Sequence, residues 1–237
     1  MNQTLTLLSF GDQGWGDEIA TGVVLTVALA VATVPLGLII GFFLALAKQS
    51  KEQSLRMAAN VYTTIFRGLP ELLTLFLVYY GAQIVIQNIV AIFWGRTFIE
   101  VNSFTAGMVA MALMFSSYAS EAFLSAFRGI PRGQYEGGYA LGLSKVQTMR
   151  LVIFPQLIRL ALPGLANLWL ILLKDTALVS VIGMSDLLRN AGVAAKVTKE
   201  PFLFYGLACL IYLALSIISS RGIVRIEKWA RRGETVR

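Results

Sequence analysis

Long apolar segments alternate with short polar or basic segments along the whole chain. Five of the apolar segments are long enough to cross a bilayer as an α-helix, which takes about 20 residues. Because unpaired backbone groups are costly in lipid, segments of this kind form helices. The sequence therefore predicts an all-α integral membrane protein with a single transmembrane domain over residues 1–237. Its predicted spans cover about 19–47, 57–82, 104–127, 156–183 and 201–220.

Glycine and proline mark special positions in and between these spans. Gly37 and Gly41 form a GxxxG pair in the first span, which either lets another helix approach closely or is merely tolerated in lipid. Pro163 followed by Gly164 predicts a break in the fourth span. Residues 84–93 are too few and too interrupted to cross, so we place them at the outer interface. Residues 184–200 are predicted to form a short polar outer loop.

The distribution of Lys and Arg predicts the orientation of the chain. Three of the polar segments, 48–56, 128–159 and 221–237, hold most of the basic residues. The remaining polar segments hold only Arg96, Arg189, Lys196 and Lys199. Since cytoplasmic segments carry the excess of positive charge, the N-terminus is expected outside and the C-terminus in the cytoplasm. Residues 1–18 contain no Lys or Arg, unlike a signal peptide, so the first span is expected to be retained.

Composition excludes several classes of function. The chain is 57% hydrophobic and 14% charged, whereas soluble domains average about 25% charged residues. Its net charge of +7 lies in short clusters between spans, so nucleic-acid binding is not expected. There is no His and only one Cys, Cys209, which excludes Cys/His metal sites and Ser-His-Asp triads. A phosphate-binding G-x-x-x-x-G-K-[ST] loop is absent as well. We therefore predict no catalytic residue and no metal or nucleotide site on this chain.

The inner loop between the third and fourth spans, residues 128–155, contains a predicted helix. Pro131 suits a first helical position, and Glu136 is placed in an early turn, where a carboxylate complements the helix dipole. Gly142 can end the helix with a left-handed residue. A short polar helix in a cytoplasmic loop suggests a docking element for another protein.

The residues of this loop resemble the EAA motif of ABC-importer permeases. The matching positions, which the resemblance assigns to coupling with the ATPase, are Glu136, Gly137, Gly138, Gly142 and Pro155. Gly137-Gly138 replaces the usual Ala-Ala, and Phe154 replaces the usual Leu. Because glycine lowers helix stability by about 1 kcal/mol relative to alanine, the helix is expected to depend on its partner for order.

Two further strings, RGLPELL from Arg67 and LKDTALVSVIG from Leu173, resemble permeases of bacterial importers for polar amino acids. They are similar to the permeases of the histidine, lysine-arginine-ornithine and opine systems. The resemblance implies a multi-pass inner-membrane subunit that forms the translocation path. Its expected partners are two copies of an ATPase subunit that carry ATP and Mg, a second permease that is a homologue or a copy of this chain, a periplasmic solute-binding protein, the amino-acid substrate and membrane lipid. An ion channel or a structural membrane scaffold is the alternative.

Charged and polar residues inside the spans are the candidates for function. Arg67 and Glu71 stand four residues apart and share a helix face, which permits an ion pair with each other or with a neighbouring helix. We predict a structural intramembrane pair, with substrate contact as the alternative. A zwitterion in a low-dielectric cavity needs opposing charges, which suggests a set of substrate-path residues. For Glu121 an ion pair with Arg128 fits equally well. For Lys174 and Asp175, pairing between helices fits equally well. The predicted substrate-path residues are Glu121, Ser117, Tyr118, Lys174 and Asp175.

Overall fold

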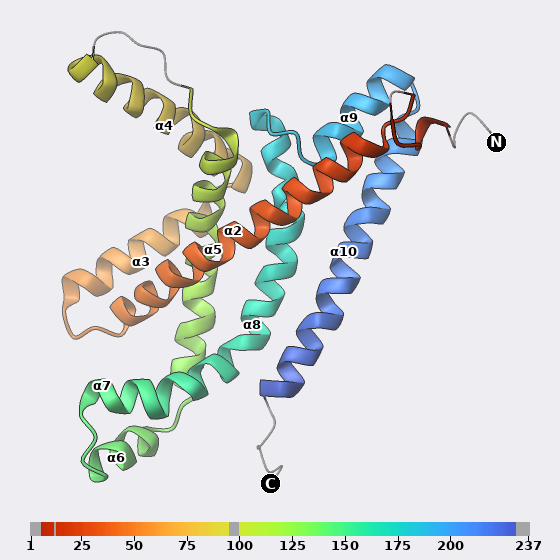
Figure 1. Cartoon of the computed structure of the whole chain (residues 1–237). Helices are drawn as coiled ribbons and strands as arrows, with labels where there is room; N and C mark the ends of the chain where they lie inside the picture. The colour runs from red at the N-terminus through yellow and green to blue at the C-terminus, as the bar shows by residue number, and fades with distance from the viewer. Residues whose placement is uncertain (1–5, 12, 95–99, 231–237) are drawn as a thin grey trace.

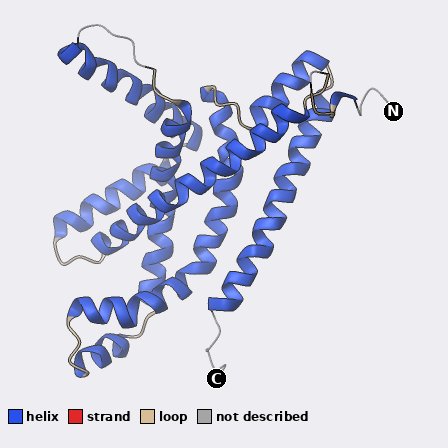
Figure 2. Ribbon diagram, in the orientation of Figure 1, coloured by secondary structure: helices blue, strands red, loops and turns tan. Residues whose placement is uncertain are grey.

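The structure is a computed structural model, which describes residues 6–11, 13–94 and 100–230. In these ranges it is built from helices joined by short connections, with no strand (Figure 2). Five helical segments are long and apolar enough to cross a membrane. The predicted all-α fold with five spans is thus confirmed. The helices are α2 (Gly16–Lys48), α3 (Gln53–Gly68), α4 (Glu71–Trp94), α5 (Ser103–Gly129), α6 (Arg132–Ala140), α7 (Lys145–Thr148), α8 (Phe154–Asp175), α9 (Leu187–Thr198) and α10 (Pro201–Ala230).

The second span differs from its prediction. A break at Leu69 and Pro70 divides the predicted 57–82 helix into α3 and α4, because Leu69 is extended before a proline. Helix α3 has apolar residues on one side only, and the spanning helix is α4. Residues 84–93, predicted at the outer interface, form the second half of this span. The sequence pattern misplaced the boundary because α3 and α4 adjoin without a polar loop.

Three further boundaries also differ from the sequence-based prediction. Helix α8 runs through Pro163 without the predicted break, and continues as a 3₁₀ helix, Thr176–Ile182. Residues 187–198, predicted as loop, form α9, which Asp186 caps through its side chain. Helix α10 extends ten residues beyond its predicted end, to Ala230. The helix continues past the apolar segment into the basic residues that follow it.

Helix α5 forms the centre of the molecule. In its most apolar stretch 67% of residues are buried, against 6% in α4 and 11% in α10. It packs against α2, α3, α4 and α8 (Figure 1). Its buried Ser116, Ser117 and Ser120 bond to carbonyls of their own helix or to Tyr62, so their hydroxyls need no water. The outer faces of α4 and α10 are left to lipid or to another protein.

Small residues bring α2 against α5. A Cβ atom on Gly41 would lie 2.9 Å from the Cβ of Ala119, and one on Gly37 would lie 2.6 Å from the Phe115 ring. The GxxxG pair therefore mediates close packing, the first of its two interpretations.

Replacing Gly41 with Ala should destabilise the fold by about 1–3 kcal/mol, because the added methyl group overlaps Ala119. The matched control is Gly81→Ala in α4, where a new Cβ meets no atom within 4 Å. Thermal unfolding in detergent checks this. A midpoint for Gly41→Ala equal to that of Gly81→Ala would contradict the close approach.

The cap of α9 predicts a pH effect. Burial raises the pKa of the Asp186 carboxyl to about 6 from 3.8, although N–H groups of Arg189 and Leu188 stabilise its charged form. Between pH 3.8 and about pH 6 the Asp186 carboxyl binds more protons in the folded chain than in the unfolded chain. Its contribution to stability therefore falls as pH rises through this window. Asp186→Asn stays neutral and keeps a capping oxygen. We expect the variant to be more stable than wild type at pH 7.5, by at most about 3 kcal/mol, and to lose this advantage towards pH 4.

Unfolding midpoints of the Asn variant and wild type across pH 4–7.5 test this expectation. The exposed Glu52→Gln serves as the control for removal of a carboxylate. A constant difference between Asp186→Asn and wild type over the whole range would contradict it.

Candidate functional site

A small cavity lies between α4, α5 and α8. Its volume is about 170 Å³, and apolar side chains such as Met111, Met114 and Leu168 form most of its wall. The polar groups that line it are Glu71, Asp175 and the side chain of Tyr118. None of the described lining residues is Lys or Arg. Two partly buried carboxyl groups thus share a largely apolar site, and the nearby cation, Lys174, which interacts electrostatically with Asp175, is outside the lining.

The ends of two helices position these carboxyl groups. Glu71 is the first residue of α4, directly after the Pro70 break, where the helix dipole favours a negative charge. Asp175 is the last residue of α8 and directly precedes the 3₁₀ helix, Thr176–Ile182, that continues it. Both carboxyl groups are thus fixed at junctions of helical segments, Glu71 after the Pro70 break and Asp175 before the 3₁₀ helix.

An ion cluster lies beside the cavity. The Lys48 ammonium is 2.5 Å from Glu121 Oε1, and a guanidinium nitrogen of Arg67 is 3.2 Å from the same oxygen. The side chain of Lys48 is only 4% exposed, so this pair is largely shielded from water. Arg67 also lies over the Tyr118 ring, with its Cζ 5.7 Å from the ring centre. Tyr118 therefore contacts both the cluster and the cavity.

Among the described residues Arg67 and Glu71 do not pair with each other; Arg67 pairs with a neighbouring helix, the other arrangement that the sequence left open. The two residues belong to different helices, because the break at Leu69 and Pro70 ends the four-residue spacing on which the prediction rested. Arg67 instead pairs with Glu121 of α5, and Glu71 faces the cavity. The expected Glu121–Arg128 pair is replaced by the pairs with Lys48 and Arg67.

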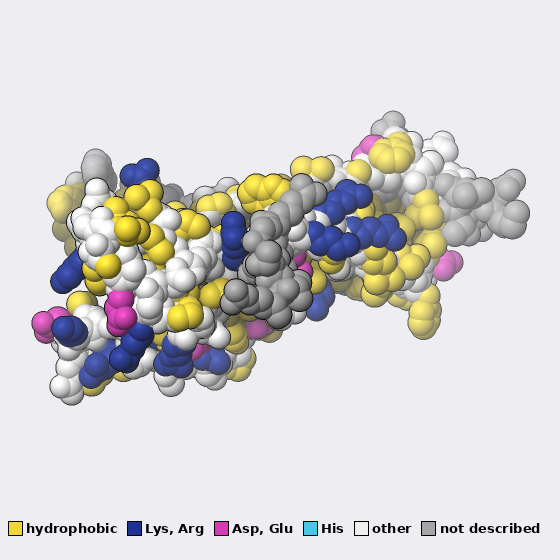
Figure 3. All heavy atoms as spheres, turned by 90° about the horizontal axis from the view of Figure 1, so that it is seen from below, with side chains coloured by type: hydrophobic (Ala, Val, Ile, Leu, Met, Phe, Trp, Pro, Cys, Tyr) yellow, Lys and Arg dark blue, Asp and Glu magenta, His cyan; other side chains and the backbone are white. Residues whose placement is uncertain are grey.

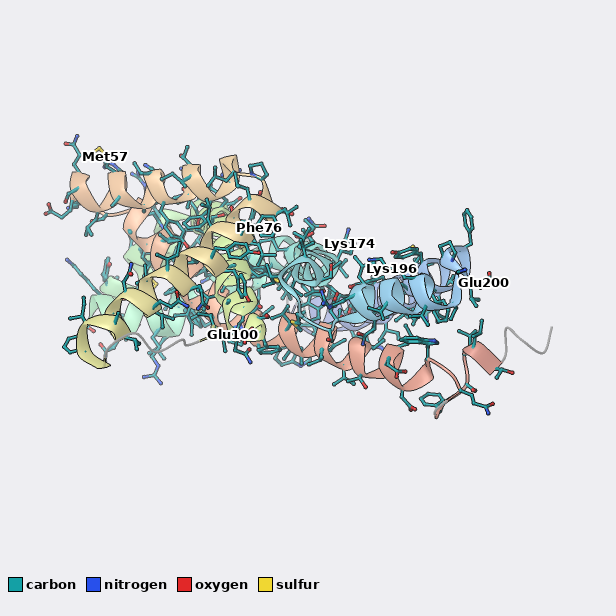
Figure 4. The ribbon with its side chains drawn as sticks, turned by 90° about the horizontal axis from the view of Figure 1, so that it is seen from above. Met57, Phe76, Glu100, Lys174, Lys196 and Glu200 are labelled. Atoms are coloured by element: carbon teal, nitrogen blue, oxygen red, sulfur yellow. The ribbon has the colours of Figure 1, made fainter. Side chains whose placement is uncertain are left out.

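Of the predicted substrate-path residues, two line the cavity, and three do not: Glu121, which belongs to the ion cluster, Ser117 and Lys174. Tyr118 and Asp175 line the cavity. Ser117 is fully buried and donates its hydroxyl hydrogen to the carbonyl of Met114 at 2.7 Å. Lys174 is exposed, and in Figure 4 it lies between Phe76 of α4 and Lys196 of α9. Glu71, which was expected to have a structural role, also lines the cavity. The sequence feature that could have indicated this is an acidic residue at the start of an apolar helix.

The loop between α5 and α8 folds into a compact helical unit at one end of the molecule (Figure 1). Gly142 has φ +77°, the left-handed conformation predicted for the end of the helix. Gly138 is buried, and a Cβ there would lie 2.6 Å from Thr148. The absence of a side chain at Gly138 thus allows α6 to pack on α7.

Two expectations for this loop need correction. Pro131 precedes the first turn of α6 and is not its first helical residue. Glu136 lies in the second turn, too far along to act strongly on the dipole, and its side chain is exposed. Pro155 is near the start of α8, after a π-helical turn, Met149–Ile153, that joins α7 to α8.

Apolar side chains project from this otherwise polar loop. The exposed fractions of Tyr139, Leu141 and Val146 are 47%, 82% and 75%. Exposed apolar groups that lie together on a polar surface are typical of a protein-binding site.

Comparison with known proteins identifies the family. Residues 34–231 match the model of the binding-protein-dependent transport system inner membrane component. The nopaline transport system permease protein NocQ of Agrobacterium fabrum is 43% identical and covers 97% of this chain and 98% of its own. The arginine permease ArtQ of Haemophilus influenzae is 41% identical, over 87% and 90%. The histidine/lysine/arginine/ornithine permease HisQ of Salmonella typhimurium is 35% identical, over 91% and 94%.

Solved structures agree with the sequence comparison. The crystal structure of an amino acid ABC transporter with histidines contains a chain that is 31% identical, with a TM-score of 0.76, over 90% of this chain and 94% of that one. The MetNI methionine ABC transporter has a chain with the same fold, at a TM-score of 0.70 and 17% identity. A family model that covers most of the chain, relatives that match over nearly full length and a shared fold lead to one assignment. The chain belongs to the family of inner membrane components of binding-protein-dependent transport systems, the permease subunits of ABC transporters.

Proposed function

We propose that this chain is the membrane-spanning subunit of an ATP-driven importer for cationic amino acids or opines in the bacterial inner membrane. A periplasmic solute-binding protein delivers the substrate. ATP and Mg bind to two ATPase chains, and a second permease, either a homologue or a copy of this chain, completes the path. The names of the relatives, which include nopaline, octopine, arginine, lysine and ornithine, support this class of substrate.

The cavity between α4, α5 and α8 carries the proposal. Its two carboxyl groups lie in an apolar wall that holds no described cation. Arginine, lysine and ornithine each have a side-chain cation, which can replace the water that such carboxylates otherwise need. The Tyr118 ring can contact the cation or the aliphatic part of the substrate. Glu71, Asp175 and Tyr118 are therefore the proposed substrate-contact residues.

The coupling role falls to the loop with α6 and α7. Its exposed Tyr139 and Leu141 offer an apolar contact for a groove of the ATPase, and Glu136 adds an exposed carboxylate for a basic partner. The loop is directly continuous with α5 and, through the π-helical turn, with α8. A displacement of the loop therefore acts on two of the three helices that line the cavity.

The orientation proposed from charge is N-terminus outside and C-terminus in the cytoplasm. The α6–α7 loop and the end of α10 lie at one end of the molecule, and the N-terminal end of α2 and α9 lie at the other (Figure 1). Basic side chains gather on the end with α6, α7 and α10 (Figure 3). This grouping supports the placement of that end on the side of the ATPase.

Neutralising either cavity carboxylate tests the substrate site. Glu71→Gln or Asp175→Asn should weaken binding of a cationic amino acid by about 10–100-fold, because each variant removes one charge-assisted contact. The measurement is the substrate concentration that gives half-maximal uptake by the complete transporter in proteoliposomes.

The matched control is Glu52→Gln, which removes an exposed carboxylate outside the cavity. Normal uptake kinetics in both cavity variants would place the substrate elsewhere, whereas the family assignment would stand.

Gly142 tests the coupling role. Gly142→Val forces a branched residue into a left-handed conformation that costs about 1–2 kcal/mol, and so should distort the end of α6. We expect the complete transporter to insert into the membrane and to hydrolyse ATP, but this hydrolysis should no longer drive uptake. Gly133→Ala in α6 is the control, because a Cβ there meets open space and its φ is not positive. Wild-type uptake by Gly142→Val would contradict the prediction.

A further inference from the structure

A hydrophobic groove lies beside the substrate cavity, and Phe115 of α5 lines both. Its volume is about 820 Å³, and its lining comes from α2, α5, α8 and α10. Helix α10 stands apart from α5, with α8 between them (Figures 1 and 2). Nearly all of the lining is aliphatic or aromatic. Representative residues are Val34, Leu38, Phe42, Ile158, Trp169 and Ile223.

The groove continues into a basic hollow. A second cavity of about 430 Å³ shares Phe42 and Phe154 with the groove and adds Lys145 and Arg150 to its lining. Lys145 is the first residue of α7, and Arg150 lies in the π-helical turn. The ion pairs of the described residues involve Lys48, Arg67 and Glu121, so these two cations have no acidic partner there. The lining of this second cavity is itself mostly apolar, so the two cationic side chains stand at its edge, next to the two phenylalanines that it shares with the groove.

This arrangement matches the chemistry of a phospholipid. In a bilayer an acyl chain gains van der Waals contact from such a groove rather than transfer out of water, and a phosphate forms charge-assisted hydrogen bonds with Lys and Arg. Basic pockets between spanning helices on the cytoplasmic side are suited to anionic head groups. A soluble ligand would leave the apolar groove unfilled, and a neutral lipid would leave two cations uncompensated.

We propose that the groove and the basic hollow together bind one anionic phospholipid, with its acyl chains along α2, α8 and α10 and its phosphate between Lys145 and Arg150. Both cations belong to the connection between α6 and α8. The bound phosphate therefore stabilises the connection through which the loop acts on α8. The site is independent of the identity of the transported substrate.

Native mass spectrometry of the complete transporter tests this. The complex is released from nanodiscs that contain equal amounts of phosphatidylglycerol and phosphatidylcholine. Wild type should retain phosphatidylglycerol preferentially. In the double variant Lys145→Gln, Arg150→Gln, we expect the ratio of retained phosphatidylglycerol to phosphatidylcholine to fall about tenfold or more, because each cation near the surface contributes to head-group binding. The control Lys51→Gln, Arg56→Gln removes the same charge outside the site and should leave the ratio unchanged.

A second pair of variants tests the groove itself. Gly222 lines the groove on α10, and a Cβ there meets no atom within 4 Å, so Gly222→Phe should fill the groove and lower lipid retention. Gly206→Phe, in equally open space on the same helix but outside the groove, is the control.

Three results would overturn the proposal. Equal retention of the two lipids by wild type would show that the site does not select an anionic head group. Unchanged selectivity in the Lys145→Gln, Arg150→Gln variant would show that these two residues do not bind the head group. If Gly222→Phe instead separates the two permease subunits, the groove is an interface with the second permease.

Discussion

The close packing of α2 against α5 supports the rest of the structure. Without side chains at Gly37 and Gly41, the two backbones approach closely enough for α2 to cover the serine-rich face of α5. This covering places Lys48, the last residue of α2, against Glu121. In a bilayer, where burial of apolar surface does not drive helices together, van der Waals contact of this kind and polar pairing are the main sources of cohesion.

Charge pairing divides the acidic residues of the membrane region into two roles. Glu121 accepts from two cations, Lys48 and Arg67, and its charge is compensated within the protein. Glu71 and Asp175 have no such partner among the residues lining their cavity. Both carboxyl groups are partly buried, and in the proposed function a cationic substrate supplies the opposite charge that the lining lacks. Tyr118 contacts Arg67 of the ion cluster and also lines the cavity, so it connects the ion cluster with the proposed substrate site.

The loop at the end of α5 has two different surfaces. One carries the exposed Tyr139 and Leu141, which suit a protein partner, and the other carries Lys145 and Arg150 beside the hydrophobic groove. The Gly138–Thr148 contact holds α6 on α7, and the π-helical turn continues into α8 without a loop. An ATPase on one surface and a lipid on the other would therefore act on the same helical connection.

Much of this architecture could be predicted from sequence, because apolar length and basic loops report directly on transfer between water and lipid. Five spans, the left-handed Gly142 and the EAA-like loop were all readable in this way. Pairing was not readable: four-residue spacing suggested Arg67 with Glu71, yet one proline placed these residues on different helices and turned Arg67 to Glu121. The substrate cavity likewise combines residues that lie 47 and 57 positions apart along the chain, from Glu71 to Tyr118 and from Tyr118 to Asp175. Local periodicity determines which segments become spanning helices, but only the packing of those helices decides which charges meet.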